Sequence, residues 1–467
     1  MEGLEVSIIN LSQLVFNNPT YRLDSEFFKK EYINLFRKIL SKRTNKLVNL
    51  SDWITQGPNP SFSESHIPCL TGRNINKSRV NYNNADYISE SEYKKLERFQ
   101  LNIGDTLITL KGKGSIGKIG FVTEDRKAIF SRDIGLIRPN SIDAAYVNAY
   151  LLSYFGAKTI ERGETGGTGQ STLTSSYLKN VDVVRLGIES NIGNLIRQSE
   201  ILILKSKNLY TQAEELLLEE VGLKDFQPTQ KAVNIKSFSE SFGSSGRLDA
   251  EYYQPKYDAI ESKLLSNPHI ILGNIITRIE TGEYSQEYFH KNEQNNLSFY
   301  IRSTNINHGQ IEIDNRYFVP KFKFKKIAKT GDIVTARVGS VGIFGEIREH
   351  TSGSIYSDNV INFRLPEDFT PSVYTLLFNT KYYFDIIEKL SRGSVQQRLN
   401  QETMKDLIIP IIDYNKQQQI AQLIEQSFSL QQQSKQLLEI AKRAVELAIE
   451  EEEDIALKYI EEQTKDL

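Results

Sequence analysis

Apolar and polar residues alternate along two stretches of the chain, and each stretch predicts a set of short strands. The first stretch covers residues 105–110, 118–122, 128–130 and 134–137, and the second covers residues 332–335, 342–347 and 360–363. Alternation with a period of two, interrupted by glycine, is typical of strands joined by turns. Apolar residues at helical spacing flank both stretches, at residues 25–41, 143–160, 250–265 and 371–390. Each stretch with its helices therefore predicts a mixed α+β globule.

A long polar helix with one incomplete apolar stripe is predicted after each globule. The first covers residues 191–221, and the second extends from residue 415 to about residue 460. One apolar stripe among Gln, Lys, Ser and Glu is typical of two helices that pair, and we expect an antiparallel coiled coil. At about 1.5 Å per residue the first helix would span on the order of 45 Å, enough to separate two globules by about one turn of DNA. A generic dimerisation coiled coil is the alternative, but it does not explain why a helix follows each globule.

The two globules are copies of one sequence pattern. Arg22-Leu23-Asp24-Ser25-Glu26-Phe27-Phe28 returns as Arg247-Leu248-Asp249-Ala250-Glu251-Tyr252-Tyr253, and matches at a similar displacement continue through both halves. They include Asn74 with Asn305, Gly104-Asp105 with Gly331-Asp332, Ser115-Ile116-Gly117 with Ser340-Val341-Gly342, and Ser199 with Ser427. Solenoid repeats are only about 20 to 50 residues long, so this is a duplicated globule-plus-helix unit. Duplication predicts a pseudo-twofold arrangement and a target with two parts.

The repeat predicts four segments. The first globule would cover residues 1–189, the central helix 190–226, the second globule 227–413, and the C-terminal helix 414–467.

Composition excludes several classes of protein. The 467 residues include a single cysteine, Cys69, which is too few thiols for a disulfide framework or a zinc cluster, and the five histidines have no ligand spacing. We therefore expect no metal site and a buried Cys69. The N-terminus has no signal-peptide pattern, and no apolar run approaches the roughly 18 residues of a membrane helix. The expected location is the cytoplasm, without a membrane partner.

The charges are unevenly distributed although the formal net charge is only -2. Residues 439–467 contain ten acidic and four basic residues, whereas residues 72–138 contain thirteen basic and eight acidic ones. A local basic patch can bind phosphate even when an acidic helix elsewhere cancels the total charge. Ordinary solvated faces would give the same counts, so charge alone does not decide.

The apparent catalytic motifs do not hold. Gly112-Lys113-Gly114-Ser115-Ile116-Gly117 fits G-x-G-x-x-G, but a strand follows where a dinucleotide site needs a helix, and the second copy lacks the first glycine, so we expect a turn. Asn18-Pro19-Thr20-Tyr21 is similar to the N-P-P-Y loop of amino-methyltransferases but lacks its second proline, and it too predicts a turn. No phosphate-binding loop of the G-x-x-x-x-G-K-S/T type and no repeated Ser/His/Asp order occurs. The sequence therefore predicts binding surfaces and no catalytic residues.

Taken together, these motifs resemble the specificity subunit of type I restriction-modification enzymes. The resemblance rests on R-L-D-A-E-Y-Y, then G-D-x-x-x-T and S-x-G, then a glycine-glutamine-leucine segment closed by Asp406-Leu407-Ile408-Ile409-Pro410, then a helix opening at Gln417. Both halves show this order, so the resemblance covers almost the whole chain. The first copy departs from it at residues 181–185, which lack the proline, and its helix opens without the glutamine triplet.

The resemblance implies a non-catalytic subunit. Each globule would be a target recognition domain for one half of a split, asymmetric sequence in double-stranded DNA. The paired helices would set the spacing and dock two modification (methyltransferase) subunits. Restriction (helicase-nuclease) subunits would join the complex, and S-adenosylmethionine, ATP and Mg would bind those partner subunits, with no cofactor on this chain.

Candidate DNA contacts are polar residues on segments predicted to be turns. Arg and Lys suit guanine or phosphate, and Asn and Gln suit adenine. In the first copy they are Arg73, Asn74, Lys111, Lys113, Lys118, Thr168, Gln170 and Ser171. In the second copy they are Arg302, Asn305, Arg337, Ser340, Arg392, Gln396, Gln397 and Arg398.

Two other functions are compatible with parts of the pattern. A non-enzymatic scaffold whose globules bind peptides or glycans would have the same paired-helix spacer but no salt-sensitive affinity for DNA. A single chain that fuses specificity with methyltransferase and nuclease activity would need catalytic motifs that this sequence lacks.

Overall fold

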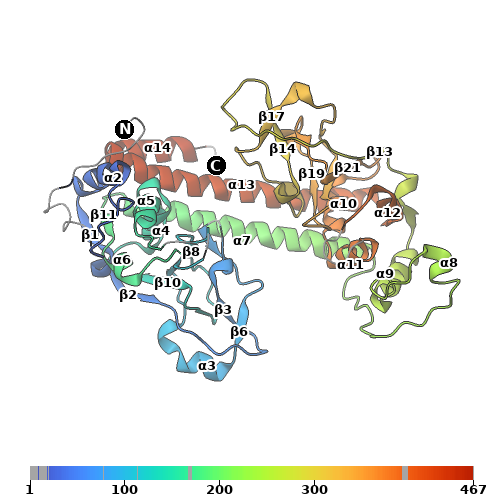
Figure 1. Ribbon diagram of the computed structural model, residues 1–467, viewed down its shortest axis with the longest axis horizontal. Helices are drawn as coiled ribbons and strands as arrows, with labels where there is room; N and C mark the ends of the chain where they lie inside the picture. The colour runs from blue at the N-terminus through green and yellow to red at the C-terminus, as the bar shows by residue number, and fades with distance from the viewer. Residues whose placement is uncertain are drawn as a thin grey trace. The chain divides into compact units, whose positions relative to one another are not determined.

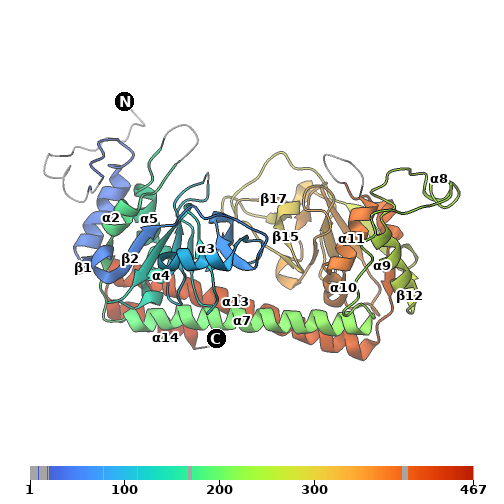
Figure 2. The same cartoon turned by 90° about the horizontal axis from the view of Figure 1, so that it is seen from below.

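The computed structural model describes residues 20–76, 78–112, 114–166, 171–391 and 398–465, together with Ile9, Asn18 and Leu467. The chain divides into two compact units, each with a share of both long helices. Unit 1 consists of Met1–Leu204 and Leu430–Leu467, and unit 2 of Lys205–Ser429. Figures 1 and 2 show the elements of both units.

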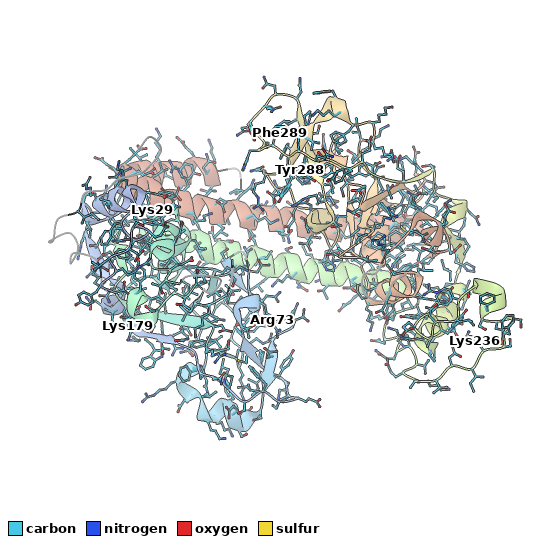
Figure 3. All side chains as sticks on the ribbon, in the orientation of Figure 1. Lys29, Arg73, Lys179, Lys236, Tyr288 and Phe289 are labelled. Carbon is cyan, nitrogen blue, oxygen red and sulfur yellow. The ribbon has the colours of Figure 1, made fainter. Side chains whose placement is uncertain are left out.

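Unit 1 is built from short strands flanked by helices, as the alternation predicts. Its strands are β1 (Thr44–Lys46), β2 (Ser51–Gln56), β3 (Ile67–Leu70), β4 (Ile75–Asn76), β5 (Ser78–Val80), β6 (Asp86–Ile88), β7 (Thr106–Thr109), β8 (Ile119–Phe121), β9 (Ile129–Phe130), β10 (Ile134–Pro139) and β11 (Asp182–Val184). Its helices are α2 (Lys30–Leu40), α3 (Glu90–Lys95), α4 (Ala144–Leu152), α5 (Tyr154–Arg162), α6 (Ser175–Lys179) and α14 (Glu453–Thr464), with 3-10 turns η1 (Leu47–Leu50), η2 (Gly72–Asn74) and η3 (Glu97–Phe99). The turn η2 carries Arg73, which is labelled in Figure 3.

Unit 2 repeats this order of elements. Its strands are β12 (His269–Ile271), β13 (Arg278–Thr281), β14 (Leu297–Ile301), β15 (Ile306–Asn307), β16 (Gln310–Ile311), β17 (Phe318–Pro320), β18 (Ile333–Ala336), β19 (Phe344–Glu346), β20 (Ile355–Tyr356), β21 (Val360–Arg364) and β22 (Ile408–Pro410). Its helices are α8 (Phe242–Ser245), α9 (Pro255–Leu265), α10 (Pro371–Phe378), α11 (Lys381–Leu390) and α12 (Gln401–Lys405), with 3-10 turns η4 (Leu272–Asn274), η5 (Ser303–Asn305), η6 (Lys321–Lys323) and η7 (Glu349–Thr351).

Strand pairing confirms the α+β class and the internal repeat. In unit 1, β10 lies between β2 and β7, and β7 pairs with β8. In unit 2, β21 lies between β13 and β18, and β18 pairs with β19. Each unit also has a strand with one antiparallel and one parallel neighbour, β3 between β6 and β9 and β14 between β17 and β20. The duplicated sequence thus folds into the same sheet pattern twice.

Two predicted helices are each divided in two. Residues 143–160 were expected to form one helix, but α4 ends at Leu152 and α5 begins at Tyr154. Residues 371–390 are likewise divided between α10 and α11. Ser153 is extended and caps α5 by accepting a hydrogen bond from Gly156 N at 3.4 Å. A Cβ on Gly156 would lie 2.0 Å from Tyr150 O, so the sharp corner requires glycine. Apolar periodicity continues across the corner, which is why the pattern predicts a single helix.

The long helices α7 (Glu189–Glu220) and α13 (Tyr414–Glu450) pair in an antiparallel direction, as predicted. In unit 1 the buried Ser199 hydroxyl donates to Ser434 O at 2.8 Å and the Ser434 hydroxyl donates to Ser199 O at 2.7 Å. In unit 2 the buried Ser427 hydroxyl donates to Ser206 O at 2.8 Å. Because Ser199 corresponds to Ser427 and Ser206 to Ser434, the two pairs are equivalent under the repeat.

The C-terminal helix is shorter than predicted. Instead of continuing to about residue 460, α13 ends at Glu450 and α14 begins at Glu453. A run of acidic residues, 450–454, coincides with the break, and like charges on consecutive turns disfavour a helix. Lys42 Nζ donates to Glu451 O at 2.8 Å, and Gly187 N donates to Glu453 Oε2 at 2.7 Å. These contacts with other residues of unit 1 stabilise the break between the two helices.

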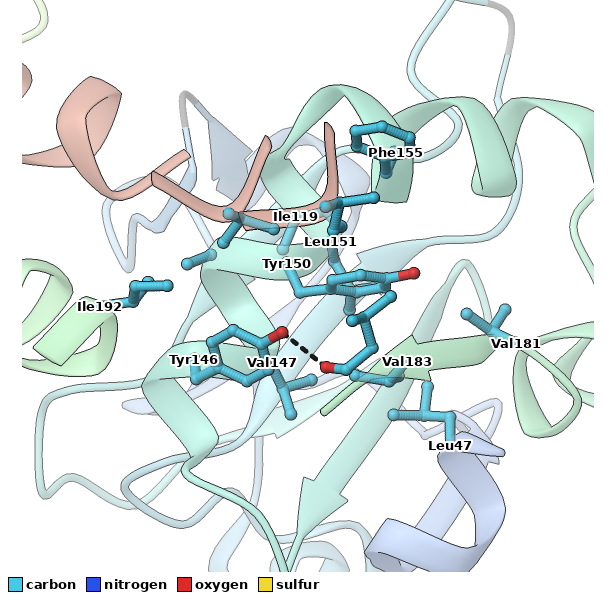
Figure 4. Close-up of a cluster of buried hydrophobic side chains, with 14 of the residues drawn as sticks. Leu47, Ile119, Tyr146, Val147, Tyr150, Leu151, Phe155, Val181, Val183 and Ile192 are labelled. Carbon is cyan, nitrogen blue, oxygen red and sulfur yellow. Dashed lines mark hydrogen bonds between the residues drawn. The ribbon is translucent and has the colours of Figure 1, made fainter. Parts of the chain in front are cut away.

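The core of unit 1 lies between its helices and the share of α7 and α13 that it contains. Tyr146 is fully buried there and its hydroxyl donates to Val184 O at 2.6 Å (Figure 4). The equivalent Tyr374 of unit 2 donates to Pro410 O at 3.1 Å. Cys69 is buried, as expected, and burial raises the pKa of its thiol to about 12. In the described part of the chain, no helix has the length and apolar character needed to cross a bilayer.

Candidate nucleic-acid interface

In unit 1, loops from distant parts of the sequence meet at one end of β7. We call them loop cluster 1, which consists of the described residues of three loops: 110–112 and 114–118 between β7 and β8, 131–133 between β9 and β10, and 163–166 and 171–173 between α5 and α6. Leu110 N donates to Asp133 O at 2.8 Å, and Leu173 N donates to Leu110 O at 2.9 Å. Lys111 forms a bridge with Thr172. Backbone hydrogen bonds therefore hold the three loops together.

Unit 2 joins its equivalent loops in the same way. Loop cluster 2 consists of residues 337–342, residues 357–359 and the described ends of the segment 391–399. Arg337 N donates to Asn359 O at 2.8 Å, and Leu399 N donates to Arg337 O at 3.0 Å. Val338 forms a bridge with Arg398, matching the bridge between Lys111 and Thr172.

Several predicted contact residues come together in these clusters. Lys118, Ser340 and Arg398 are exposed, and Lys111, Ser171 and Arg337 are half-buried. Within the described ranges no carboxylate forms an ion pair with Lys111, Lys118, Arg337 or Arg398. Their positive charges are thus available to an anionic ligand.

The turns η2 and η5 lie beside the loop clusters and carry the predicted Arg73 and Arg302. A Cβ on Gly72 would lie 3.1 Å from the Thr109 side chain, and one on Gly339 would lie 4.0 Å from Ser303 Oγ. Arg73 Nη2 lies 2.5 Å from Asp86 Oδ1, with 56% of its side chain exposed. Arg302 is more constrained, because its guanidinium carbon lies 3.2 Å from the centroid of the Tyr317 ring and Nη2 lies 3.9 Å from Asp314.

Asn74 and Asn305 were predicted to contact bases, but this prediction is wrong because both side chains are buried. Asn74 is 1% exposed and Asn305 4% exposed. The Asn74 amide accepts from Thr71 N at 2.9 Å and donates to Asn81 O at 2.9 Å, and the Asn305 amide accepts from Arg302 N at 3.0 Å and donates to Glu312 O at 3.1 Å. Both side chains organise the turn that presents their neighbours.

The remaining predicted contacts lie outside the described residues. They are Lys113, Thr168, Gln170, Arg392, Gln396 and Gln397. Described residues on both sides of each of these segments belong to the loop clusters.

The described residues of the glycine-rich segment, Gly112 and residues 114–117, lie in a turn between β7 and β8, as predicted. Gly112, Gly114 and Gly117 have φ values of +124°, +70° and +74°, which favour glycine. Gly117 N donates to Thr109 O at 2.9 Å, and β8 follows. The N-terminal segment Asn18–Tyr21 is also closed as a turn, with Tyr21 N donating to Asn18 O at 3.1 Å, and Pro19 lies outside the described residues.

Two sets of cations near the clusters were missed at the sequence level. Arg132 is exposed in loop cluster 1, next to Asp133. In unit 2 the run Lys321-Phe322-Lys323-Phe324-Lys325-Lys326 follows β17, with Phe322 81% exposed. Lys326 Nζ donates to Thr281 O at 2.5 Å, near the end of β13. The run is visible in the sequence as alternating lysine and phenylalanine, whereas a lone Arg132 gives no signal.

Each unit thus has joined loops whose exposed cations suit an anionic ligand such as a nucleic-acid backbone. Residues 256–440 match the family described as the type I restriction modification DNA specificity domain. That range extends from α9 of the second copy into α13. The second half of the chain is thus similar to this family, in agreement with the resemblance that its motifs show. No curated protein matches the sequence.

Three solved structures that match the chain share 13% sequence identity with it. The S subunit of a type-I restriction-modification system from M. genitalium is 13% identical over 90% of this chain and 95% of that chain, with a TM-score of 0.41. The HsdS subunit from Thermoanaerobacter tengcongensis is 13% identical over 88% of this chain and 97% of that chain, with a TM-score of 0.28. A chain from a study of complex assembly and conformational transition of the type I R-M system is 13% identical over 90% of this chain and 97% of that chain, with a TM-score of 0.28.

Proposed function

We propose that this chain is the DNA specificity subunit of a type I restriction-modification complex and binds a bipartite, asymmetric target in double-stranded DNA. The observation that carries the proposal is the duplicated loop cluster, which in both units carries cations without a carboxylate partner among the described residues. Phosphate contacts supply affinity, and side chains on loops that reach base edges supply sequence preference. Loop clusters 1 and 2 would each bind one half-site.

The two half-sites would differ because the two clusters carry different side chains. Lys111, Lys118 and Arg132 belong to loop cluster 1, whereas Arg337, Ser340 and Arg398 belong to loop cluster 2. Arginine can form a bidentate contact with guanine that lysine cannot reproduce. A target without palindromic symmetry follows from this difference.

The paired helices would act as the spacer and as the docking site of two methyltransferase subunits. The 32 residues of α7 would span roughly 48 Å at about 1.5 Å per residue. In this proposal the chain performs no chemistry. The methyltransferase and helicase-nuclease subunits bind S-adenosylmethionine, ATP and Mg in the cytoplasm.

A binding selection tests the proposal directly. The purified chain is mixed with a randomised 40-base-pair duplex library, and bound duplexes are sequenced over several rounds at two salt concentrations. We expect enrichment of two short sequences with a fixed, unselected gap, and an affinity that falls steeply as salt rises. An affinity without sequence enrichment, or no salt-sensitive affinity at all, would contradict the proposal, and the second result would favour a protein-binding scaffold.

A further inference from the structure

The R-L-D-x-E motif that begins each copy makes contacts that DNA binding does not by itself explain. In the first copy, Arg22 Nε and Nη2 donate to the Asp24 carboxylate at 2.7 and 2.6 Å, and only 15% of the Arg22 side chain is exposed. This contact holds the pKa of the Asp24 carboxyl below its usual range. Asp24 thus aims the guanidinium in one direction.

The free edge of that guanidinium binds the start of a recognition loop. Arg22 Nη1 donates to Arg162 O at 3.0 Å and to Glu164 O at 2.6 Å. These carbonyls lie on both sides of Gly163, where α5 ends and the loop 163–173 of loop cluster 1 begins. One donor therefore fixes two peptide groups at the first corner of the loop.

The same loop is held at its other end by the sheet. Thr165 N donates to Thr172 O at 2.8 Å and Thr172 N donates to Thr165 O at 2.7 Å, which closes the base of the loop. Leu173 N then donates to Leu110 O at 2.9 Å. At the first arm, Gly163 N and Glu164 N donate to carbonyls of α5, and Arg22 adds the side-chain contact that ties this corner to the motif.

The contact of two cations with one aromatic ring completes the anchor. The guanidinium carbons of Arg22 and Arg162 lie 5.1 and 3.7 Å from the centroid of the Phe27 ring. Phe27 is itself the aromatic residue of the motif, and it is fully buried. The motif is thus packed against the end of α5 as one unit.

The second copy repeats the arrangement with different side chains. Arg247 pairs with Asp249 and its Nη1 lies 3.5 Å from Lys389 O, near the end of α11. Tyr252 takes the place of Phe27, with the Arg247 guanidinium carbon 4.3 Å and Lys389 Nζ 5.0 Å from its centroid. Two copies that differ at most positions keep the contact of two cations with one aromatic ring, which a purely local turn would not require.

We propose that Arg22 and Arg247 are positioning residues, each anchoring the end of α5 or α11 from which a loop of its own loop cluster begins. The inference rests on the proposed function, since it takes the loop clusters as the DNA-binding surfaces. A loop that is fixed before binding loses less conformational entropy when it binds, and base contacts tolerate little displacement. The role of each arginine is therefore confined to one half-site.

Hydrogen exchange tests the anchor without DNA. In the full-length chain, Arg22→Ala should speed exchange of the amides in the peptide covering residues 163–175 at least tenfold, and leave the peptides of unit 2 unchanged. Asp24→Asn should give a smaller increase, because the guanidinium keeps its carbonyl contacts. Leu23→Ala is the matched control, since Leu23 lies in the same motif with 78% of its surface exposed. Unchanged exchange in Arg22→Ala would overturn the anchor.

The duplex library then tests the positioning role. Arg22→Ala should lose at least tenfold of the enrichment at one half-site and retain the other, and Arg247→Ala should show the reverse. Unchanged hydrogen exchange in β7 and β10 of Arg22→Ala, or in β18 and β21 of Arg247→Ala, shows that the mutated unit is still folded. Faster exchange with both half-sites retained would overturn the positioning role, whereas failure of the wild-type chain to enrich any sequence would overturn the proposed function and this role with it.

Discussion

At the scale of single residues, the Gly-Asp pair of each copy is a stability element. Asp105 is 1% exposed and accepts from Arg138 at 2.7 and 2.8 Å and from Asn102 N at 2.8 Å. Asp332 is fully buried and lies 2.5 Å from Arg278 and 2.7 Å from Arg364. The preceding glycines, Gly104 and Gly331, have φ values of +93° and +84°, which other residues rarely adopt.

We expect Asp105→Asn to lower the free energy of unfolding of unit 1 by on the order of 3 kcal/mol, the low end for breaking a buried ion pair, because Arg138 partly reaches solvent. Trp53, the single tryptophan, belongs to unit 1, so its fluorescence during urea unfolding follows that unit. The exposed ion pair of Arg73 and Asp86 offers a control, because Asp86→Asn should lower the free energy of unfolding by only about 1 kcal/mol or less. Equal losses in both variants would contradict the assignment.

Arg398 is the described residue best placed to distinguish base contact from phosphate contact. Its side chain is exposed, and its backbone is fixed by the bridge to Val338. If it forms a bidentate contact with guanine, Arg398→Ala should weaken binding to the second half-site by about 1 to 3 kcal/mol and relax the preference at one position. Titration of labelled duplexes that carry each base at that position measures this effect. A uniform loss across all sequences with a shallower salt dependence would instead identify a phosphate contact.

The types of residue on the predicted turns indicated the region of the candidate site correctly, but they indicated its individual residues less well. Lys111 and Lys118 are found in loop cluster 1, as the glycine-rich turn suggested. Asn74 and Asn305 were misassigned because an asparagine amide can cap a turn or contact a base with the same groups, and only the surrounding atoms decide. Arg132 was missed because the hydrogen bond that places its loop involves the backbone of Asp133, which leaves no trace in side-chain identity.

At the scale of elements, buried serines link the paired helices. In unit 2, Ser427 Oγ donates to Ser206 O and lies 3.1 Å from Ser206 Oγ. In unit 1, Arg79 Nη2 also donates to Ser199 Oγ at 3.0 Å and to Ser434 Oγ at 2.6 Å, joining β5 to both helices. Buried polar groups of this kind favour one register of a helix pair over others.

Ser427→Ala should destabilise unit 2 by about 1 to 2 kcal/mol, because it leaves the Ser206 hydroxyl buried without its partner. Ser206→Ala should cost less, since Ser427 still donates to the Ser206 carbonyl. The double variant should cost less than the sum of the single changes, because no hydroxyl is then left unsatisfied. Thermal unfolding followed by circular dichroism gives all three values, and strict additivity would show that the hydroxyls do not interact.

Strands were predicted more accurately than helix ends. Alternation placed β7, β8, β10, β18, β19 and β21 within a residue or two, because each strand buries at least one face of the sheet. The corners at Ser153 and Glu451 were not predicted. Both depend on contacts made after folding, with Gly156 fitting against Tyr150 O and Lys42 binding Glu451 O.

At the scale of the whole molecule, the repeat could be detected in the sequence because the two copies kept the order of their motifs, although many side chains differ. The sequence could not show that each compact unit takes part of both long helices. The boundary between the units falls at Leu204 and Lys205 in α7 and at Ser429 and Leu430 in α13. In each helix that boundary lies between two serines that are one heptad apart, Ser199 and Ser206 or Ser427 and Ser434.

This arrangement gives a sharp test of the helices as a spacer. Duplicating residues 200–206 of α7 together with residues 428–434 of α13 adds one heptad to each helix and retains both serine pairs. Each helix lengthens by about 10 Å, close to three base pairs of about 3.4 Å, with a rotation of roughly 20°. The selected half-sites should stay the same while the unselected gap grows by about three base pairs, as read by sequencing the bound library. The matched control, a heptad in α7 alone, should disrupt one serine pair and abolish enrichment. If the doubly extended chain selects its original gap, the helices do not set the spacing.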